Sequence, residues 1–193
     1  MKSIGIVWLL AGLVQSLWAA RVGEPAPAFE LKDLQGNPHS LAKYKGRTVV
    51  LEWFNLGCPF VQKHYGSGNM QGLQGKYVGK GVVWLGIRTG DVDAEALAAM
   101  QKKLAVRSSA WLLDASGEVA RAFGARATPH VFVVGPGGRV VYSGAVDDKP
   151  TPDPATVAGA RNYVAEALDA ILAGRKIPVP VTRPYGCGVK YGK

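Results

Sequence analysis

Short apolar runs alternate with polar, glycine-containing segments along most of the chain. Runs rich in β-branched and aromatic residues, bounded by turn-forming residues, are typical of buried strands. Five such strands are predicted, at residues 47–54, 82–87, 110–113, 131–134 and 139–143. A small hairpin is predicted from residues 30–34 and 39–41, which flank a Gly-Asn-Pro turn.

Helical spacing of apolar residues appears in three other segments, 93–104, 118–123 and 156–172. A further helix is predicted to begin at Pro59 and run toward Tyr77, kinked or weakened by its four glycines. Strands that alternate with helices, followed by a hairpin and a last helix, predict an α/β domain over residues 21–176. Its mixed central sheet should carry helices on both faces. Residues 177–193 contain three prolines and predict a flexible tail without regular structure.

The first twenty residues have the pattern of a secretory signal peptide. Lys2 is the only charged residue, an apolar run from Ile4 to Val14 is short for a membrane span, and Ala19 and Ala20 follow. We therefore expect cleavage after one of these alanines and an exported, periplasmic protein with no stable membrane insertion. An uncleaved N-terminal anchor is the alternative.

The net charge of +9 comes from basic residues that are scattered along the chain. No basic stripe with interleaved aromatic residues is present, which argues against nucleic-acid binding. The positive charge favours anionic surfaces or partners. The two cysteines, Cys58 and Cys187, are too few for a disulfide scaffold, although an oxidising compartment would let them pair. A chemical use of these thiols is therefore favoured over a structural one.

The stretch NLGCPFVQKHY places Cys58 between a predicted strand and a predicted helix. Pro59 suits the first turn of that helix. Unpaired N–H groups and the partial positive charge of a helix N-terminus lower the pKa of a cysteine, and the thiolate is the reactive form. Lys63 and His64 would add positive charge if they face the sulfur.

Two other features favour redox chemistry. Glu52 lies in the middle of an apolar strand, and a buried acid with a raised pKa can accept a thiol proton; the alternative is that it points to solvent or pairs with a lysine. Thr128-Pro129 directly precedes an apolar strand, where a cis peptide bond would resolve the missing ladder donor. The Thr128 backbone would then be free to pair with a partner's chain beside the thiol.

Together these features resemble the thioredoxin superfamily, and within it the AhpC/TSA redoxin and peroxiredoxin-like branch with an Asn-x-x-Cys-Pro site. The resemblance spans about residues 21–146 and is specific at its motifs, which include GEPAPAF and DLQGNPHSL. CPFVQKHY, together with GCGVKY in the tail, looks most like the redoxin group with the Asn-x-x-Cys-Pro site. The resemblance implies a thioredoxin-like fold with an N-terminal redoxin-type hairpin. It also implies that Cys58 is the reactive thiol and that Pro129 is the cis-proline facing it. We expect no cofactor.

Several positions depart from the family pattern. Thioredoxins carry a second cysteine where this chain has Val61, and peroxiredoxins carry Thr or Ser where it has Asn55. Asn55 can donate and accept hydrogen bonds but has a different reach. Peroxiredoxins also use an arginine across the site, for which Arg126 and Arg88 are nearby candidates. Peroxidase activity therefore does not transfer automatically, and disulfide exchange is favoured over peroxide reduction.

Cys187 is the other sulfur that could resolve an intermediate at Cys58. Glycines on both sides suit a thiol that must move, and attack on a mixed disulfide or sulfenic acid needs only access and alignment. We predict a resolving cysteine; a static Cys58–Cys187 disulfide and a free or intermolecular Cys187 are the alternatives. The predicted catalytic residues are Cys58, Cys187, Glu52 and Asn55, and the predicted substrate-binding residues are Thr128, Pro129 and Pro59. The expected partners are a thiol reductant and a disulfide-bearing protein or a peroxide.

Two other classes of function compete with an oxidoreductase. Cys58, His64, His130 and Cys187 could bind a soft ion such as Cu(I), although we expect no metal. A non-catalytic binding module that kept the fold is the second, because a fold does not imply a function.

Overall fold

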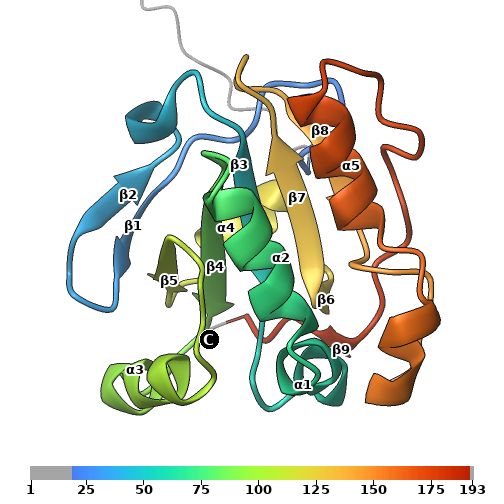
Figure 1. The fold of residues 1–193 in the computed structure, drawn as a ribbon. Helices are drawn as coiled ribbons and strands as arrows, with labels where there is room; N and C mark the ends of the chain where they lie inside the picture. Colours follow the sequence, from blue (N-terminus) through green and yellow to red (C-terminus); the bar gives the residue numbers. More distant parts are fainter. Residues whose placement is uncertain (1–18, 192–193) are drawn as a thin grey trace, which may run out of the picture.

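A seven-stranded mixed sheet forms the centre of the computed structural model, which describes residues 19–191 (Figure 1). The predicted signal peptide therefore lies almost entirely outside the described residues. The strand order is β2-β1-β5-β4-β3-β7-β8. The strands are β1 (Glu30–Asp33), β2 (Pro38–Ser40), β3 (Val49–Trp53), β4 (Val83–Thr89), β5 (Ala110–Asp114), β7 (His130–Val134) and β8 (Val140–Gly144).

Parallel and antiparallel neighbours meet at the central strand β3. It runs parallel to β4 and antiparallel to β7, so that Trp53 at its end lies beside His130 at the start of β7. The loop after β3 carries Cys58, and the residue before β7 is Pro129. This strand order alone brings the two sequence motifs to the same edge of the sheet.

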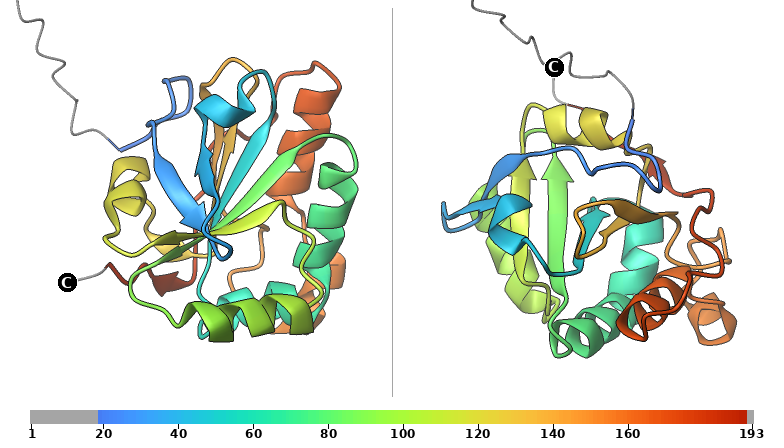
Figure 2. Two further views of the ribbon diagram at one scale, coloured as in Figure 1. Left: turned by 90° about the vertical axis from the view of Figure 1, so that its left-hand side faces the viewer. Right: turned by 90° about the horizontal axis from the view of Figure 1, so that it is seen from above.

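The helices cover both faces of the sheet, as the sequence predicted (Figure 2). They are α1 (Pro59–Gly66), α2 (Asn69–Val78), α3 (Ala94–Lys103), α4 (Glu118–Phe123) and α5 (Tyr163–Leu172), with 3-10 turns at Ala42–Tyr44 and Pro154–Gly159. Residues of α1, α2, α3 and α5 pack with Val50 in one apolar cluster. Residues of α4 pack with Val49 and Leu51 in another. Alternate residues of β3 thus serve opposite cores.

Two helix predictions differ from the structure. The helix predicted from Pro59 toward Tyr77 is two helices, because Gly68 takes a left-handed conformation (φ 75°) and begins α2. The helix predicted at 156–172 is wrong in its first part: Ala160 is extended, and the helix begins only after Asn162, whose side chain accepts a hydrogen bond from the Ala165 N–H. A side-chain cap of this kind starts a new helix.

The prolines of the C-terminal tail predicted a segment without regular structure, but the tail contains a short strand. Cys187–Gly188 forms the short strand β9, which pairs antiparallel with β6 (Ala127–Thr128). Thr182 also bonds the backbone of Ser143 in β8. The tail therefore runs back across the end of the domain that carries Cys58.

Within residues 19–191, every helix is too short or too polar to cross a membrane.

Candidate active site

Cys58 occupies the N-cap position of α1, and Pro59 is the first residue of the helix, as predicted. The Cys58 carbonyl accepts the N–H groups of Val61 and Gln62, which fixes the helix start. The cysteine side chain is buried, with 1% of the residue exposed. Its sulfur is therefore held at the helix N-terminus, an electropositive position that suits a thiolate.

The Thr128–Pro129 peptide bond is cis, which confirms the sequence prediction. The Cys58 thiol donates to the Thr128 carbonyl, with Sγ 3.0 Å from the oxygen. The loop before β7 thus faces the cysteine directly.

Cys187 lies beside Cys58 although 129 residues separate them. In the β6–β9 pairing Cys187 stands opposite Thr128, and its backbone N–H donates to Cys58 Sγ at 3.4 Å. Both cysteines are free thiols, so a static disulfide is not what the structure contains. The tail occupies the Thr128 backbone edge that was expected to be open for a partner.

The two thiols differ in acidity. Burial raises the pKa of Cys58, but hydrogen bonds from the Cys187 thiol, the Cys187 N–H and the Val61 N–H outweigh it, and the net pKa lies below the ordinary value. The same hydrogen bond to Cys58, together with burial, raises the pKa of Cys187 to about 11. Cys58 is therefore the thiol that ionises first, while Cys187 keeps its proton.

Glu52 is fully buried and points to the face of β3 that carries α1 and α2. It accepts hydrogen bonds from the Tyr65 hydroxyl at 2.9 Å, the Trp84 indole at 2.8 Å and the Gln74 amide at 3.4 Å. Burial raises the pKa of Glu52 to about 7, against these hydrogen bonds. Within residues 19–191 Glu52 has no lysine partner and its side chain is not exposed, so the alternative left open by the sequence is wrong. No hydrogen bond joins this carboxyl to Cys58 within the described part of the chain.

Asn55 makes no hydrogen bond to the Cys58 sulfur in the described part of the chain. Its side-chain oxygen accepts the Gly57 N–H at 3.0 Å and so closes the turn before Cys58. The two arginines offered for a peroxide site do not bond Cys58 either: Arg88 donates to the Thr89 carbonyl, and Arg126 is exposed.

Lys63 and His64 are turned away from the sulfur. Lys63 is buried and forms an ion pair with Asp147, with Nζ 3.0 Å from Oδ2. His64 bonds Asn69 through Nδ1 at 2.8 Å and Tyr185 through Nε2 at 3.5 Å. Burial lowers the pKa of His64 to about 4, so the ring is neutral at physiological pH. The positive charge of Lys63, expected beside Cys58, instead pairs with Asp147 in a cluster with Tyr185 that the sequence did not predict.

The copper alternative finds little support in the geometry. His130 Nδ1 accepts the Arg126 N–H at 3.2 Å and its Nε2 bonds Ser143 at 3.3 Å, so both ring nitrogens are engaged. Burial lowers the pKa of His130 to about 3. Across residues 19–191, no group of three or more His, Cys, Asp or Glu side chains converges as metal ligands would.

The profile of the AhpC/TSA family matches residues 22–143, which is more than half of the chain. The chain belongs to the AhpC/TSA family. The matched region contains Cys58, Glu52 and the Thr128–Pro129 loop but ends before Cys187. The tail thiol is therefore a feature of this chain outside the matched family region.

Two of three proteins similar to this AhpC/TSA protein carry redox names. It is 26% identical over 151 residues to the thiol-disulfide oxidoreductase ResA of Geobacillus thermodenitrificans, covering 72% of this chain and 83% of the relative. A hypothetical protein of Sinorhizobium meliloti has a solved structure similar over 90% of this chain and 96% of its own, at 26% identity and a TM-score of 0.76. A thiol:disulfide interchange protein of Chlorobium tepidum shares the fold over 80% of this chain and 99% of its own (21% identity, TM-score 0.58).

These findings confirm the predicted thioredoxin-like fold and support a thiol-disulfide oxidoreductase of the thioredoxin superfamily. The Asn-x-x-Cys-Pro subgroup stays a prediction.

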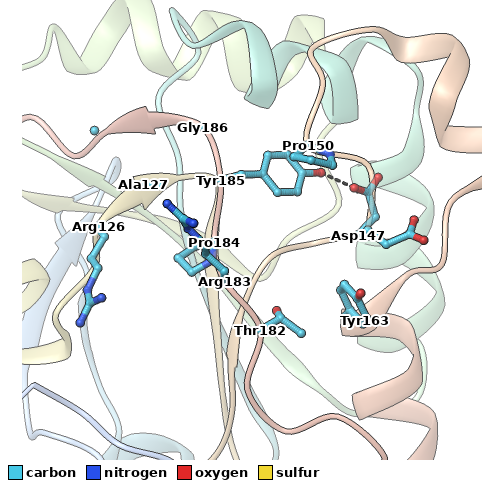
Figure 3. Close-up of a pocket in the computed structure, with 12 residues that line it drawn as sticks. Arg126, Ala127, Asp147, Pro150, Tyr163, Thr182, Arg183, Pro184, Tyr185 and Gly186 are labelled. Carbon is cyan, nitrogen blue, oxygen red and sulfur yellow. Dashed lines mark hydrogen bonds between the residues drawn. The ribbon is translucent and has the colours of Figure 1, made fainter.

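A cavity of about 770 Å³ lies beside the tail strand (Figure 3). Tyr185 projects across it from the tail toward Asp147, to which its hydroxyl donates a hydrogen bond. Sequence analysis missed Asp147, Tyr185 and the role of Lys63, because a lone charge or tyrosine in a loop carries no local pattern. In the sequence, the one feature that could have drawn attention to Tyr185 is its place two residues before Cys187, with a glycine between them.

Proposed function

We propose that this AhpC/TSA protein is an exported thiol-disulfide oxidoreductase in which Cys58 is the nucleophile and Cys187 the resolving thiol. One observation carries the proposal: the N–H of Cys187 is 3.4 Å from Cys58 Sγ while both thiols are free. Export is supported by the apolar N-terminal pattern with its small residues at 19 and 20.

The reaction balances as two thiol–disulfide exchanges. The Cys58 thiolate attacks one sulfur of a substrate disulfide, forming a mixed disulfide, and the other substrate sulfur leaves as a thiolate that takes up a proton. Cys187 then loses its proton and attacks the Cys58 sulfur. The substrate's remaining sulfur leaves as a thiol, and the Cys58–Cys187 disulfide forms. An external dithiol reductant returns both cysteines to the thiol state.

The acidity of the two thiols supports this order of roles. The lowered pKa of Cys58 provides thiolate for the first attack, whereas the pKa of about 11 keeps Cys187 protonated until it is needed. The reverse assignment would require the more basic thiol to ionise first.

A disulfide is favoured over a peroxide as the oxidised substrate. Peroxiredoxins place a Thr or Ser and an arginine at the peroxide site. Here Asn55 is held in the turn before Cys58 through its side-chain oxygen, Arg88 bonds the Thr89 carbonyl, and Arg126 is exposed. An extended peptide, by contrast, could take the place of β9 and pair with the Thr128 backbone while Pro129 and Pro59 border the sulfur.

Glu52 is proposed as the proton acceptor and donor during exchange. Its pKa of about 7 lets the carboxyl gain or lose a proton near neutral pH. Because it makes no hydrogen bond to Cys58, a proton would pass between them through water. Glu52→Gln should flatten the pH dependence of exchange, which a stopped-flow measurement across neutral pH can follow.

The test compares the wild-type protein with Cys58→Ser and Cys187→Ser, each reduced and mixed with a protein that has an accessible disulfide. Wild type should reduce the substrate and lose the mass of two hydrogens, Cys187→Ser should accumulate the mixed disulfide, and Cys58→Ser should do neither. Hydrogen peroxide is offered in a parallel reaction. Faster consumption of peroxide than of disulfide would replace this function with a peroxidase, and unchanged turnover of Cys187→Ser would refute the resolving role.

A further inference from the structure

Tyr185 lies two residues before Cys187 in the tail and is seated in a site built by the folded domain. The Tyr185 hydroxyl donates to Asp147, and Lys63 Nζ lies 3.3 Å from the hydroxyl oxygen. Its ring packs edge-on against Phe60 with centroids 5.8 Å apart. Phe60 follows Cys58-Pro59 directly, so the seat of the tyrosine adjoins the nucleophile.

The hydrogen-bonding capacity of the Tyr185 hydroxyl is fully used. His64 Nδ1 accepts from the Asn69 amide, which leaves the proton of the neutral ring on Nε2, 3.5 Å from the hydroxyl oxygen. The hydroxyl thus donates once, to Asp147, and accepts from Lys63 and His64. Burial and the Asp147 carboxylate raise the pKa of Tyr185 far above its ordinary value, so the donor persists at all physiological pH.

The Lys63–Asp147 pair has no part in the exchange chemistry. Its side chains are 0% and 1% exposed, and Lys63 also donates to the Lys149 carbonyl at 2.7 Å. A buried ion pair is costly to form and is weak evidence for added stability. Besides the Lys149 backbone, the pair bonds the hydroxyl of the tail tyrosine, which indicates that it forms a binding site for the tail.

Gly186 links the bound Tyr185 to Cys187 and lets the tail pass close enough to β6 for Cys187 to pair opposite Thr128. Its φ is 132°, and a Cβ there would lie 2.1 Å from the Thr128 carbonyl oxygen. Only glycine lets the tail come this close to β6. With Tyr185 fixed on one side of this close contact, Cys187 is delivered opposite Thr128.

We propose that Tyr185, held by the Lys63–Asp147 pair, is a positioning residue for the resolving thiol. The substrate must displace β9 to reach Thr128, since both cannot pair with the same backbone edge. Return of Tyr185 to its seat then brings Cys187 back to Cys58. The Cys187 sulfur replaces the substrate sulfur on Cys58, and the leaving substrate thiol carries the proton that Cys187 gave up. This role rests on the proposed function.

Tyr185→Phe tests the role because it removes one hydroxyl and keeps the ring against Phe60. Tyr163→Phe is the matched control, since Tyr163 lines the same cavity from α5. The readout is the effective concentration of Cys187 toward Cys58, measured by equilibrating each protein with reduced and oxidised glutathione and counting disulfide by mass. Loss of the hydroxyl's hydrogen bonds to the charged Asp147 and Lys63 should lower this effective concentration about tenfold or more. The lifetime of the Cys58–glutathione mixed disulfide should lengthen by a similar factor.

Unfolding of the reduced proteins separates positioning from simple stability. Tyr185→Phe should change the effective concentration by a larger factor than any change in the melting transition explains, and Tyr163→Phe should change neither. If wild type forms the Cys58–Cys187 disulfide and Tyr185→Phe shows the same effective concentration, the positioning role is overturned while the proposed function stands. If wild type forms no such disulfide, the proposed function itself fails, and this inference with it.

Discussion

Glu52→Gln should remove a pH-dependent cost that the folded protein carries at alkaline pH. The carboxyl is fully buried, and its pKa is raised from the ordinary value of 4.5 to about 7. The folded state therefore holds the proton more tightly than the unfolded state does. The stabilisation gained by holding the Glu52 proton is complete below pH 4.5 and is lost as the pH rises through about 7.

The size of this effect follows from the two pKa values. Each pH unit between them is worth about 1.4 kcal/mol, so ionisation of Glu52 costs the folded protein about 3 kcal/mol. Glutamine fits the same contacts: its carbonyl can accept from Trp84, and its amide can donate to the Tyr65 hydroxyl, which can rotate to accept. The variant should fold, and it has no charge to bury.

Urea unfolding under reducing conditions at about pH 5 and about pH 9 measures the effect. The unfolding free energy of Glu52→Gln minus that of wild type should rise by about 3 kcal/mol between the two pH values. Taking the difference cancels the other titrating groups. Glu30→Gln, at an exposed position of β1, is the control and should show no such rise. A Glu52→Gln difference that is the same at both pH values would refute the reasoning about the buried carboxyl.

Three further outcomes are expected. Asp147→Asn leaves the buried charge of Lys63 without its partner and should lower the unfolding free energy by about 3–5 kcal/mol in urea; a loss below 1 kcal/mol would mean the ion pair is not buried in solution. Gly186→Ala sets a methyl group 2.1 Å from the Thr128 carbonyl oxygen and should slow intramolecular disulfide formation about tenfold or more with an unchanged fold by circular dichroism. Alkylation of Cys58 should reach half its maximal rate below the ordinary thiol pKa of 9.0, and a midpoint at or above 9.0 would contradict its lowered pKa.

The sequence was sufficient for features that short-range patterns encode. The β-branched run before Cys58 and the proline after it predicted a strand, a turn and a helix start, and the structure has them at Val49–Trp53 and Pro59–Gly66. The helix predicted at 93–104 is capped by Asp93, whose side chain accepts two backbone N–H groups. Such periodicity and capping act within a few residues, so they can be interpreted without knowing the fold.

The sequence was misleading in two segments, where an N-cap side chain and an unpaired strand edge outweigh the more obvious local pattern. Apolar residues at helical spacing extend through 156–172, yet the Asn162 cap delays the helix to Tyr163. Three prolines in the tail indicated an irregular segment, but two residues beyond them form β9, because the edge of β6 offers unpaired backbone groups.

Part of the candidate site could be predicted from the sequence, and part is visible only in the tertiary structure. Residue types alone identified Cys58, Glu52 and Thr128-Pro129, since each is out of place in an ordinary strand or helix. Only the tertiary structure decided that Cys187 returns to Cys58 across 129 residues, that Lys63 pairs with Asp147 and that the tail is held between them. Contacts between residues so distant depend on strand order and on which side chains the core buries, and no pattern within a single segment contains that information.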